Sequence, residues 1–462
     1  MKRVLLLLAA LLLAPLASQH AAAGQMRTPN IVVVFADDLG YADLGCYGAT
    51  DIPTPHLDAL AEAGLRFTDF YVAASVCTPS RAALLTGCYP RRVGLPRVLH
   101  PHENIGLATS ETTLGRLLQG AGYATACFGK WHLGHHEPFL PHHHGFHDTL
   151  VIPYSHDMYR GAPWGNAAFT QTWPDHVPLF RRGEKVAELR GLRDFATLTK
   201  RFTDSACDFI QQHSDAPFFL YLPYTLPHLE LEAPGEWRGR SKRGPYGDAV
   251  AELDDSVGRI LATLRHRGLE ENTLVVFTSD NGPARIYQKP SFAGGSSGAL
   301  SGGKNTAFEG GFRVPCLMRW PKQIPAARTC SAPCSVMDFL PTMAALSGGA
   351  LPTAPIDGRN LLPLMRNPDH AASPHAGLLY HKDETPVAVR GGDYKLWLPN
   401  TAVNPTERPQ LYHLPSDPAE QRDLSSQKPE EIQRLNELAK SLAVPPDQVR
   451  KAAAISKPKL KR

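Results

Sequence analysis

The sequence predicts an α/β fold in which a central sheet lies between layers of helices, followed by a smaller α+β unit. Four apolar runs, rich in β-branched and aromatic residues, show no alternation of polar and apolar positions. Such runs are typical of strands buried on both faces. Helical patterns separate these runs, and after about residue 345 the chain becomes rich in Pro and Gly. Alternating strands and helices indicate an α/β domain, and the change in composition marks its end.

Each of the four predicted strands leads into charged or polar residues. Sheets of this kind bind ligands at the carboxyl ends of their strands. A polar residue after one strand is ordinary, but four such clusters that meet at one edge favour a functional site. The runs are Ile31–Phe35, Tyr123–Phe128, Phe218–Leu222 and Thr273–Phe277, and the residues after them are Asp37 and Asp38, Lys130 and His132, His228, and Asp280 and Asn281.

The helices and the C-terminal unit follow from spacing and turn residues. Residues 55–63 begin at a Pro and stop before Gly64, and residues 249–267 carry apolar side chains at helical spacing up to Gly268. In the C-terminal unit, two short strands around Gly391 and Gly392 predict a β-hairpin, and residues 429–442 predict a helix.

The size and charge of the chain limit the classes of function. Its 462 residues allow about two or three domains. The formal charge is +4, but two basic residues lie at the N-terminus and six between Arg450 and Arg462. The rest of the chain is therefore slightly acidic, which argues against a nucleic-acid-binding surface.

Residues 1–23 have the features of a signal peptide. Lys2 and Arg3 precede an apolar run from Val4 to Leu16, and a small-residue stretch ends at Ala23. An uncleaved anchor is the alternative, but the run is short for a bilayer. We expect an exported protein, periplasmic or secreted, without stable membrane insertion.

The eight cysteines do not form a dense disulfide framework. They are scattered along a chain long enough to bury a core without covalent links. No C-x-x-C motif is present, which argues against a zinc ribbon or a thioredoxin-type site. Cys330 and Cys334 are close enough in sequence to pair.

The acidic strand ends suggest a metal site. Asp37, Asp38, Asp280 and Asn281 offer only oxygen ligands, which suit a hard cation such as Ca2+ or Mg2+ better than zinc or copper. The alternative for an Asp pair after a strand is a cap or turn.

A cysteine opens a predicted helix in the segment Cys77-Thr-Pro-Ser-Arg81. The start of a helix favours an anion and lowers the pKa of a Cys placed there. Arg81, one turn along, can bind the same anion with two donors. Cys77 is therefore either a nucleophile that faces an oxyanion or a buried structural residue.

These motifs together resemble the type I sulfatases, members of the alkaline-phosphatase-like superfamily. The resemblance extends from about Pro29 to Leu424, and a stretch from Ile152 to Asp157 is similar to arylsulfatase A and to N-acetylgalactosamine sulfatases. The motifs that carry it are Asp37-Asp38-Leu-Gly-Tyr41, Cys77-Thr-Pro-Ser-Arg81 with Leu85-Thr86-Gly87, Gly129-Lys130-Trp-His132, Pro227-His228, Ser279-Asp280-Asn281-Gly282, Gly303-Lys304, Glu309-Gly-Gly-Phe-Arg313 and Leu411-Tyr-His-Leu-Pro-Ser-Asp417.

The resemblance implies an alkaline-phosphatase-like fold, with a central mixed, largely parallel sheet between helices and a smaller C-terminal α+β domain that contains an antiparallel sheet. We therefore expect the signal peptide at 1–23, the catalytic α/β domain at 24–345, the C-terminal subdomain at 346–445 and a solvated basic tail at 446–462.

The resemblance also implies a modified nucleophile and a calcium ion. In that family a formylglycine-generating enzyme oxidises the cysteine to formylglycine, and the hydrate of the aldehyde is the nucleophile, so Cys77 is the expected modified residue. The ion neutralises sulfate oxygens and lowers the pKa of the attacking hydroxyl, whose proton Asp280 accepts. Calcium is expected before magnesium, and the implied ligands are Asp37, Asp38, Cys77, Asp280 and Asn281.

The remaining implied roles concern charge and proton transfer. Arg81, Lys130 and Lys304 would hold the sulfate and the hydrate, and Ser155 would contact the substrate. His228 would also contact the substrate and protonate the leaving alcohol or phenol. The predicted activity is hydrolysis of sulfuric esters, of the arylsulfatase kind, on a sulfated small molecule or glycan.

His132 would complete the reaction. It would take the proton of the second hydroxyl of the hydrate, so that sulfate leaves and the aldehyde returns. A Ser or an unmodified Cys at position 77 lacks that second hydroxyl, which is why the chemistry requires formylglycine.

Three alternatives differ in chemistry. A phosphonate or phosphodiester hydrolase uses the same scaffold and nucleophile. A sulfated-glycan-binding protein with an inactive site is opposed by the intact set of predicted catalytic residues. A plain cysteine hydrolase leaves the acidic cluster unexplained.

Two further stretches carry open interpretations. The histidines at 135, 136, 142, 143, 144 and 147 suggest metal binding, but neighbouring histidines cannot all face one ion, and a second metal is the less favoured interpretation. An aromatic-rich stretch either rims a sugar pocket or packs beneath a long loop: Tyr159, Trp164, Phe169, Trp173 and Phe180.

Overall fold

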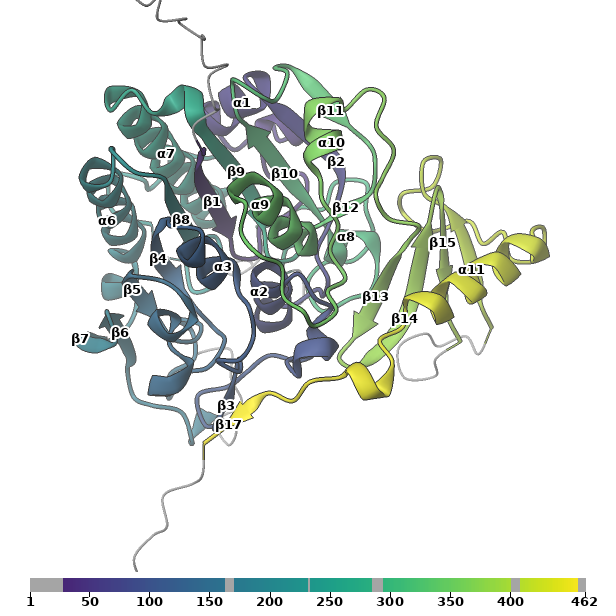
Figure 1. Ribbon diagram of the computed structural model, residues 1–462, viewed down its shortest axis with the longest axis horizontal. Helices are drawn as coiled ribbons and strands as arrows, with labels where there is room; N and C mark the ends of the chain where they lie inside the picture. The colour runs from purple at the N-terminus through teal and green to yellow at the C-terminus, as the bar shows by residue number, and fades with distance from the viewer. Residues whose placement is uncertain (1–27, 163–169, 232, 285–293, 400–407, 456–462) are drawn as a thin grey trace, which may run out of the picture.

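The computed structural model describes residues 28–162, 170–231, 233–284, 294–399 and 408–455. The predicted signal peptide lies outside these residues. Within them, a large mixed sheet with helices on both faces adjoins a small antiparallel sheet (Figure 1).

The large sheet has eleven strands in the order β11-β2-β10-β9-β1-β8-β4-β5-β6-β7, with β12 also paired to β2. The strands are β1 Asn30–Ala36, β2 Leu65–Tyr71, β4 Ala124–Lys130, β5 Asp148–Ile152, β6 Val177–Arg181, β7 Glu184–Leu189, β8 Phe218–Pro223, β9 Thr273–Ser279, β10 Arg313–Arg319, β11 Arg328–Cys330 and β12 Cys334–Ser335.

The centre of this sheet is parallel. β1 pairs in parallel with β8 and β9, and β4 pairs in parallel with β8 and β5, whereas β10, β6 and β7 join antiparallel. All four predicted strands are present in this parallel core. The predicted mixed, largely parallel sheet is therefore confirmed.

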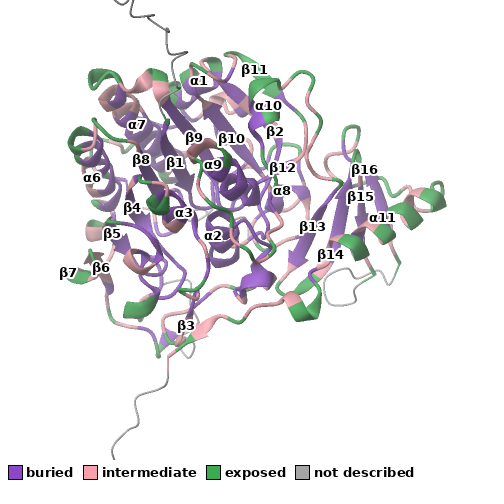
Figure 2. Ribbon diagram, viewed as in Figure 1, coloured by how far each residue is buried: buried purple, intermediate pink, exposed green. Residues whose placement is uncertain are grey.

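Both faces of the sheet are buried, as the unalternated runs predict (Figure 2). Along β1, Val32 and Val34 belong to one hydrophobic core, while Ile31, Val33 and Phe35 belong to the other. One core includes side chains of α1 Pro55–Glu62, α6 Leu198–Gln212 and α7 Gly244–His266, and the other those of α2 Cys77–Thr86, α3 Leu114–Gly120 and α9 Phe339–Ser347.

Helix α7 begins earlier than the apolar pattern predicts. It starts at Gly244 rather than at residue 249, because Pro245 in its first turn favours helix initiation. The remaining short elements are α5 Leu192–Phe195, α8 Glu309–Phe312, α10 Leu362–Arg366, β3 Ile105–Gly106 and β17 Ala453–Ala454.

The C-terminal unit is built on a four-stranded antiparallel sheet, as predicted. Its strands are β13 Leu378–Lys382, β14 Thr385–Gly391, β15 Tyr394–Trp397 and β16 Gln410–His413, in that order. The predicted hairpin corresponds to β14 and β15, which pair antiparallel. Helix α11, Pro429–Leu442, packs on this sheet through Leu435.

The described part of the predicted basic tail contacts the large unit, although Pro446, Asp447, Lys451 and Ala454 are exposed. Residues 446–455 run back from α11 to the large unit, where β17 pairs with β3 (Figure 1). Arg450 forms a two-donor ion pair with Glu111, with Nε–Oε1 at 2.7 Å and Nη2–Oε2 at 2.9 Å. The basic residue that the sequence assigns to solvent therefore holds the segment in place.

Two structural features bear on the cysteine and membrane predictions. All eight cysteines lie in described residues and all are free, so Cys330 and Cys334 do not pair. Among the described helices, none has both the length and the apolar content needed to cross a bilayer.

Candidate active site

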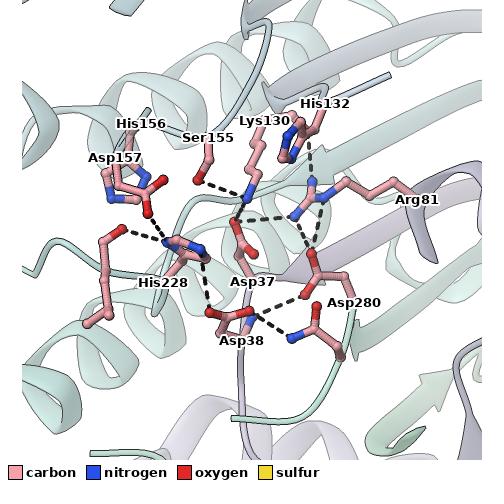
Figure 3. A network of polar contacts seen from close by, with 12 residues as sticks. Asp37, Asp38, Arg81, Lys130, His132, Ser155, His156, Asp157, His228 and Asp280 are labelled. Carbon is pink, nitrogen blue, oxygen red and sulfur yellow. Dashed lines mark hydrogen bonds and ion pairs between the residues drawn. The ribbon is translucent and has the colours of Figure 1, made fainter. Parts of the chain in front are cut away.

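The predicted site residues meet at the carboxyl ends of five neighbouring strands, β9, β1, β8, β4 and β5. Asp37 and Asp38 follow β1, Lys130 ends β4, Ser155 follows β5, His228 follows β8, and Asp280 and Asn281 follow β9 (Figure 3). Cys77 and Arg81 come from α2, and Lys304 from the loop before α8.

We call six charged residues the strand-end cluster: Asp37, Asp38, Arg81, Lys130, Asp280 and Lys304. Five of them are at most 1% exposed, and the side chain of Lys304 is 15% exposed. The cluster balances three carboxylates with three cations in a site that is almost closed to water.

Arg81 and Lys130 hold the carboxylates together. Arg81 donates to Asp280 Oδ2 from Nε at 3.1 Å and from Nη2 at 2.7 Å, and to the carbonyl of Lys130 from Nη1 at 2.7 Å. Lys130 Nζ lies 2.6 Å from Asp37 Oδ2 and 3.1 Å from Ser155 Oγ. Arg81 therefore contacts protein oxygens with all three of its nitrogens, whereas Lys130 also reaches the predicted substrate-contacting hydroxyl.

Lys304 reaches the cluster on a tightly packed loop. Its Nζ lies 2.8 Å from Asp38 Oδ2, and Asn281 Nδ2 donates to Asp38 Oδ1 at 2.7 Å. The backbone N–H of Lys304 donates to the carbonyl oxygen of Pro283 at 2.9 Å, which ties this loop to the segment that follows β9. Lys304 is therefore anchored both through its ammonium, on Asp38, and through its backbone.

Some buried acceptors in this region are left without a partner. Among described residues, Asp37 Oδ1 and Asn281 Oδ1 accept no hydrogen bond. One ligand atom each of Asp37, Asp38, Cys77 and His228 lie within 4.8 Å of one another. Unpartnered buried oxygens are costly unless something binds them, so the residues present fit a hard cation such as Ca2+ or Mg2+. Both residues with an unpartnered oxygen, Asp37 and Asn281, belong to the predicted ligand set.

The carboxylates differ in their acidity. Burial raises the pKa of Asp37, but the positive charge of Lys130, together with those of His228 and Arg81, outweighs it and holds this pKa well below its usual range. Burial, and then the charge of Asp37, raises the pKa of Asp280 to about 7. Asp37 is thus the carboxylate that stays ionised, and Asp280 is the one poised to exchange a proton near neutral pH.

The prediction of a lowered pKa for Cys77 is wrong. Cys77 is the first residue of α2 and is 3% exposed. Burial raises the pKa of its thiol to about 11, although Lys130 and Lys304 oppose the shift. Desolvation of the thiolate outweighs the helix terminus and both cations, so an unmodified Cys77 is a neutral thiol and a poor nucleophile near pH 7.

His228 points one nitrogen at the cluster. Its Nδ1 lies 2.5 Å from the carbonyl oxygen of Leu229, which can only accept, so Nδ1 carries the proton and Nε2 faces Asp38 Oδ2 at 3.5 Å (Figure 3). Burial, and then the charge of Lys304, lowers the pKa of His228 to about 3. The free imidazole is therefore neutral at pH 7.

His132 has the opposite tautomer. Its Nε2 lies 2.9 Å from the carbonyl oxygen of Leu99, so Nε2 donates and Nδ1 keeps a lone pair. Nδ1 is buried and has no partner among described residues. Burial, and then the charge of Lys130, holds the pKa of His132 well below its usual range. The residue also has φ of 58°, and Asp38 has φ of 63°, backbone conformations that non-glycine residues keep where function or packing requires them.

Three residues around His228 have no predicted role: His156, Asp157 and Glu230. Asp157 Oδ2 lies 3.8 Å from His228 Nδ1, and the His156 ring lies 5.6 Å from the His228 ring. Glu230 accepts from the hydroxyl of Tyr159 with both oxygens, at 2.9 and 3.0 Å. Asp157 and His156 directly follow Ser155, so their place in that motif is the signal that could have identified them.

The aromatic stretch is split between packing and residues that the structure does not describe. Trp173 is 1% exposed and belongs to the hydrophobic core, and Phe180 packs against the core. Trp164 and Phe169 lie outside the described residues. For Trp173 and Phe180, packing is therefore the correct interpretation.

Comparisons with known proteins identify the family. The model of the Sulfatase family matches residues 29–349. The chain belongs to the sulfatase family. The model of the C-terminal region of N-sulphoglucosamine sulphohydrolase matches residues 303–445, which include the small antiparallel sheet.

Full-length relatives agree with this assignment. The chain is 41% identical to human arylsulfatase A over 452 residues, covering 89% of this chain and 87% of that protein. It is 38% identical to mouse N-acetylgalactosamine-6-sulfatase, covering 87% and 83%. The solved structure of Ps i-CgsB in complex with k-i-k-neocarrahexaose superposes with a TM-score of 0.78 at 30% identity, covering 94% of this sulfatase and 96% of that chain. This sulfatase is a hydrolase of sulfate esters.

Proposed function

We propose that this sulfatase hydrolyses sulfate esters of sugars with a formylglycine nucleophile made from Cys77 and a bound Ca2+. The observation that carries the proposal is the position of Cys77. It stands at the start of α2 beside Asp37, Asp38 and His228, yet its thiol has a raised pKa. A neutral, buried thiol in a strongly polar site favours a residue that is converted before use.

The proposed reaction needs a modified residue and a metal ion in addition to the ordinary side chains. A formylglycine hydrate would supply two hydroxyls at one carbon. Asp37, Asp38, Asp280, Asn281 and residue 77 would hold Ca2+, which would supply positive charge to the bound sulfate. The side chains of the protein bind the substrate, fix these groups and move the protons.

Lys130 and Lys304 reach the cluster from different segments, since Lys130 ends β4 and Lys304 lies in the loop before α8. Each ends on a different carboxylate, Asp37 and Asp38 respectively. Fixed ammonium groups in a dry site stabilise the charge that develops on sulfate oxygens. Arg81 takes a positioning role, since its nitrogens hold Asp280 and the carbonyl of Lys130.

The two histidines have tautomers suited to opposite proton transfers. The Nε2 of His228 faces the site. It can carry a proton to the leaving oxygen once a bound anionic ester raises the pKa that burial, and then the charge of Lys304, lowers. The Nδ1 of His132 keeps its lone pair and can accept the proton of the second hydroxyl. This arrangement supports the general-acid role of His228 and the base role of His132.

A sugar sulfate is the favoured substrate class. Ps i-CgsB, solved with a neocarrahexaose, is 30% identical over most of both chains. Ser155, bonded to Lys130, and the buried His156 and Asp157 beside His228 supply polar groups for hydroxyls next to the sulfate. Modification requires a formylglycine-generating enzyme, and residues 1–23 support export to the periplasm or the medium.

The modification is tested by mass spectrometry of the tryptic peptide Phe67–Arg81. Protein made with a formylglycine-generating enzyme should carry an aldehyde or its hydrate at Cys77. A control sulfatase from the same host shows whether the enzyme is active there. An unmodified thiol beside a modified control would overturn the proposal.

The substrate class is tested by matched rates. The kcat/KM for an aryl sulfate should exceed that for the phosphodiester with the same leaving group, and a panel of sulfated monosaccharides should identify the preferred ring position. A wide preference for the phosphodiester would replace the proposal with a phosphodiester or phosphonate hydrolase.

A further inference from the structure

The structure divides the histidine-rich segment between residues 135 and 147 into separate environments. His136 Nε2 lies 2.9 Å from Asn104 Oδ1, and His147 Nδ1 lies 2.8 Å from Thr125 Oγ1. His144 is fully buried beside Trp131. These histidines have local packing or hydrogen-bonding roles and do not converge.

His142 and His143 instead converge on one carboxylate. Glu137 Oε1 lies 2.5 Å from His143 Nε2 and 3.4 Å from His142 Nε2. One ligand atom of each of the three side chains lies within 4.8 Å of the others. In a tetrahedral zinc site with bonds of about 2.0–2.1 Å, ligand atoms stand about 3.4 Å apart. Small side-chain rotations therefore bring all three onto one ion.

The backbone that carries these side chains is held on both sides. Glu137 opens one 3-10 turn and His142 and His143 lie in the next, and each turn has a Pro in its first positions. Arg116 Nη2 donates to the carbonyl of His143 at 2.6 Å. The His142 ring lies so close to Gly183 that a Cβ there would come within 2.7 Å of it. Because the backbone is already restrained, metal binding costs less conformational entropy.

The three side chains remain open to solvent. The side chain of Glu137 is 68% exposed, that of His143 37% and that of His142 24%. Arg181 and Arg182, which precede Gly183, are paired with Asp148, so their charge near the site is partly offset.

We propose that Glu137, His142 and His143 form a second metal site, which binds Zn2+ through two imidazole nitrogens and one carboxylate oxygen. Imidazole ligands select zinc over calcium, whereas the oxygen ligands of Asp37, Asp38, Asp280 and Asn281 select the opposite. The site lies in the connection from β4 to β5. Lys130 is the last residue of β4, and Ser155 follows the end of β5. Bound Zn2+ cross-links the two 3-10 turns of that connection.

The test uses the full chain without a histidine tag, saturated with Ca2+ and titrated with Zn2+ in a calorimeter. We expect one equivalent to bind with a Kd of about 10 μM or below. The variants Glu137→Ala and His143→Ala should each weaken binding by about 100-fold, while His136→Ala, a histidine of the same segment outside the trio, should bind as the parent does.

A second readout separates this site from the cysteines. Co2+ in place of Zn2+ should give the visible bands of a tetrahedral nitrogen and oxygen site, without the thiolate charge-transfer band that a cysteine ligand produces. Equal Zn2+ affinity in His143→Ala and the parent, a Kd in the millimolar range, or a thiolate band on the bound equivalent would each overturn the proposal. No substrate is used, so the result is independent of the proposed enzymatic function.

Discussion

Two buried clusters of this sulfatase contain the same kinds of charge but differ in how they are satisfied. The strand-end cluster balances three carboxylates with three cations, and so does a second group between the large and small sheets. We call this second group the Glu309 network: Asp69, Glu309, Arg313, Arg390, Lys395 and Glu420.

Every charged group of the Glu309 network has a partner within the protein. Lys395 Nζ lies 2.8 Å from the carbonyl of Ala307, 3.2 Å from Glu309 Oε1 and 3.1 Å from Glu420, and it stands 4.1 Å from the centre of the Tyr380 ring. None of the six side chains has an unpartnered buried atom among the described residues, whereas the strand-end region leaves Asp37 Oδ1, Asn281 Oδ1 and His132 Nδ1 without partners.

This difference shows that buried charge alone does not identify an active site. In a fully paired network every hydrogen-bonding group already has a protein partner, so none is left to bind a ligand. The Glu309 network instead links the large sheet to the small one. A network with orphaned acceptors has a cost that a bound ion or substrate can relieve.

The largest effect is expected from Cys77→Ala. Removal of the proposed nucleophile should lower kcat on an aryl sulfate by at least about 10⁴-fold, with the thermal midpoint little changed. Cys46→Ala, which removes a thiol outside the site, serves as the control. Activity of Cys77→Ala near the parent level would show that the nucleophile lies elsewhere.

Lys395→Met should act on stability rather than on chemistry. Removing one partner leaves Glu309 and Glu420 buried and uncompensated, which should cost about 3–5 kcal/mol of unfolding free energy. Urea unfolding measures this loss. The folded fraction should retain the kcat of the parent, and a kcat loss without a stability loss would contradict the structural role of the Glu309 network.

Lys304→Met should give the reverse pattern. Loss of the ammonium beside Asp38 should lower kcat/KM by about 10²–10³-fold, as expected for a group that stabilises developing charge. Unfolding free energy should change far less than in Lys395→Met. The control is Lys440→Met on the exposed side of α11, and equal kinetics in the two variants would remove Lys304 from the proposed machinery.

Calcium should stabilise the protein through the orphaned acceptors. At about 100 times its Kd, Ca2+ should add about 2.7 kcal/mol to the unfolding free energy, and exhaustive chelation should remove this together with activity. Differential scanning calorimetry with and without Ca2+ measures the gain. In Asp38→Asn the gain should be much smaller; an unchanged gain would place the ion at another site.

The smallest expected effect is an acid dependence of the Glu309 network. Burial raises the pKa of Glu309, but the charge of Lys395, with those of Arg390 and Arg313, outweighs it and lowers this pKa to about 2. The stabilisation is therefore complete above the unfolded pKa near 4.5 and declines as pH falls toward 2.

Unfolding curves at successive pH values below 4.5 test this point. The difference in unfolding free energy between the parent and Glu309→Gln should shrink as pH falls. A difference that stays constant over that interval would mean that Glu309 does not remain ionised in the folded protein.

Much of the fold could be predicted from local pattern. The unalternated runs identify the parallel core, and the hairpin and the helix at 429–442 follow from turn residues and spacing. The other strands of the large sheet were not predicted: β2, β5, β6, β7, β10, β11 and β12. Among them β6 and β7 are partly exposed and β11 and β12 are very short, so they carry little periodic signal. The docking of residues 446–455 depends on a pairing of Arg450 with Glu111, which no local pattern reveals.

The sequence by itself determined the family, the residue types of the candidate site and their order along the strands, because motif chemistry and strand ends are local properties. Tertiary structure alone decided the acidity of Cys77, the tautomers of His132 and His228, and which histidines share Glu137. These depend on desolvation and on carbonyls and charges that distant segments supply, such as Leu99 to His132. Burial and neighbouring groups exist only in the folded chain. The protonation states of Cys77, His132 and His228 are therefore set by the fold and not by the sequence motifs.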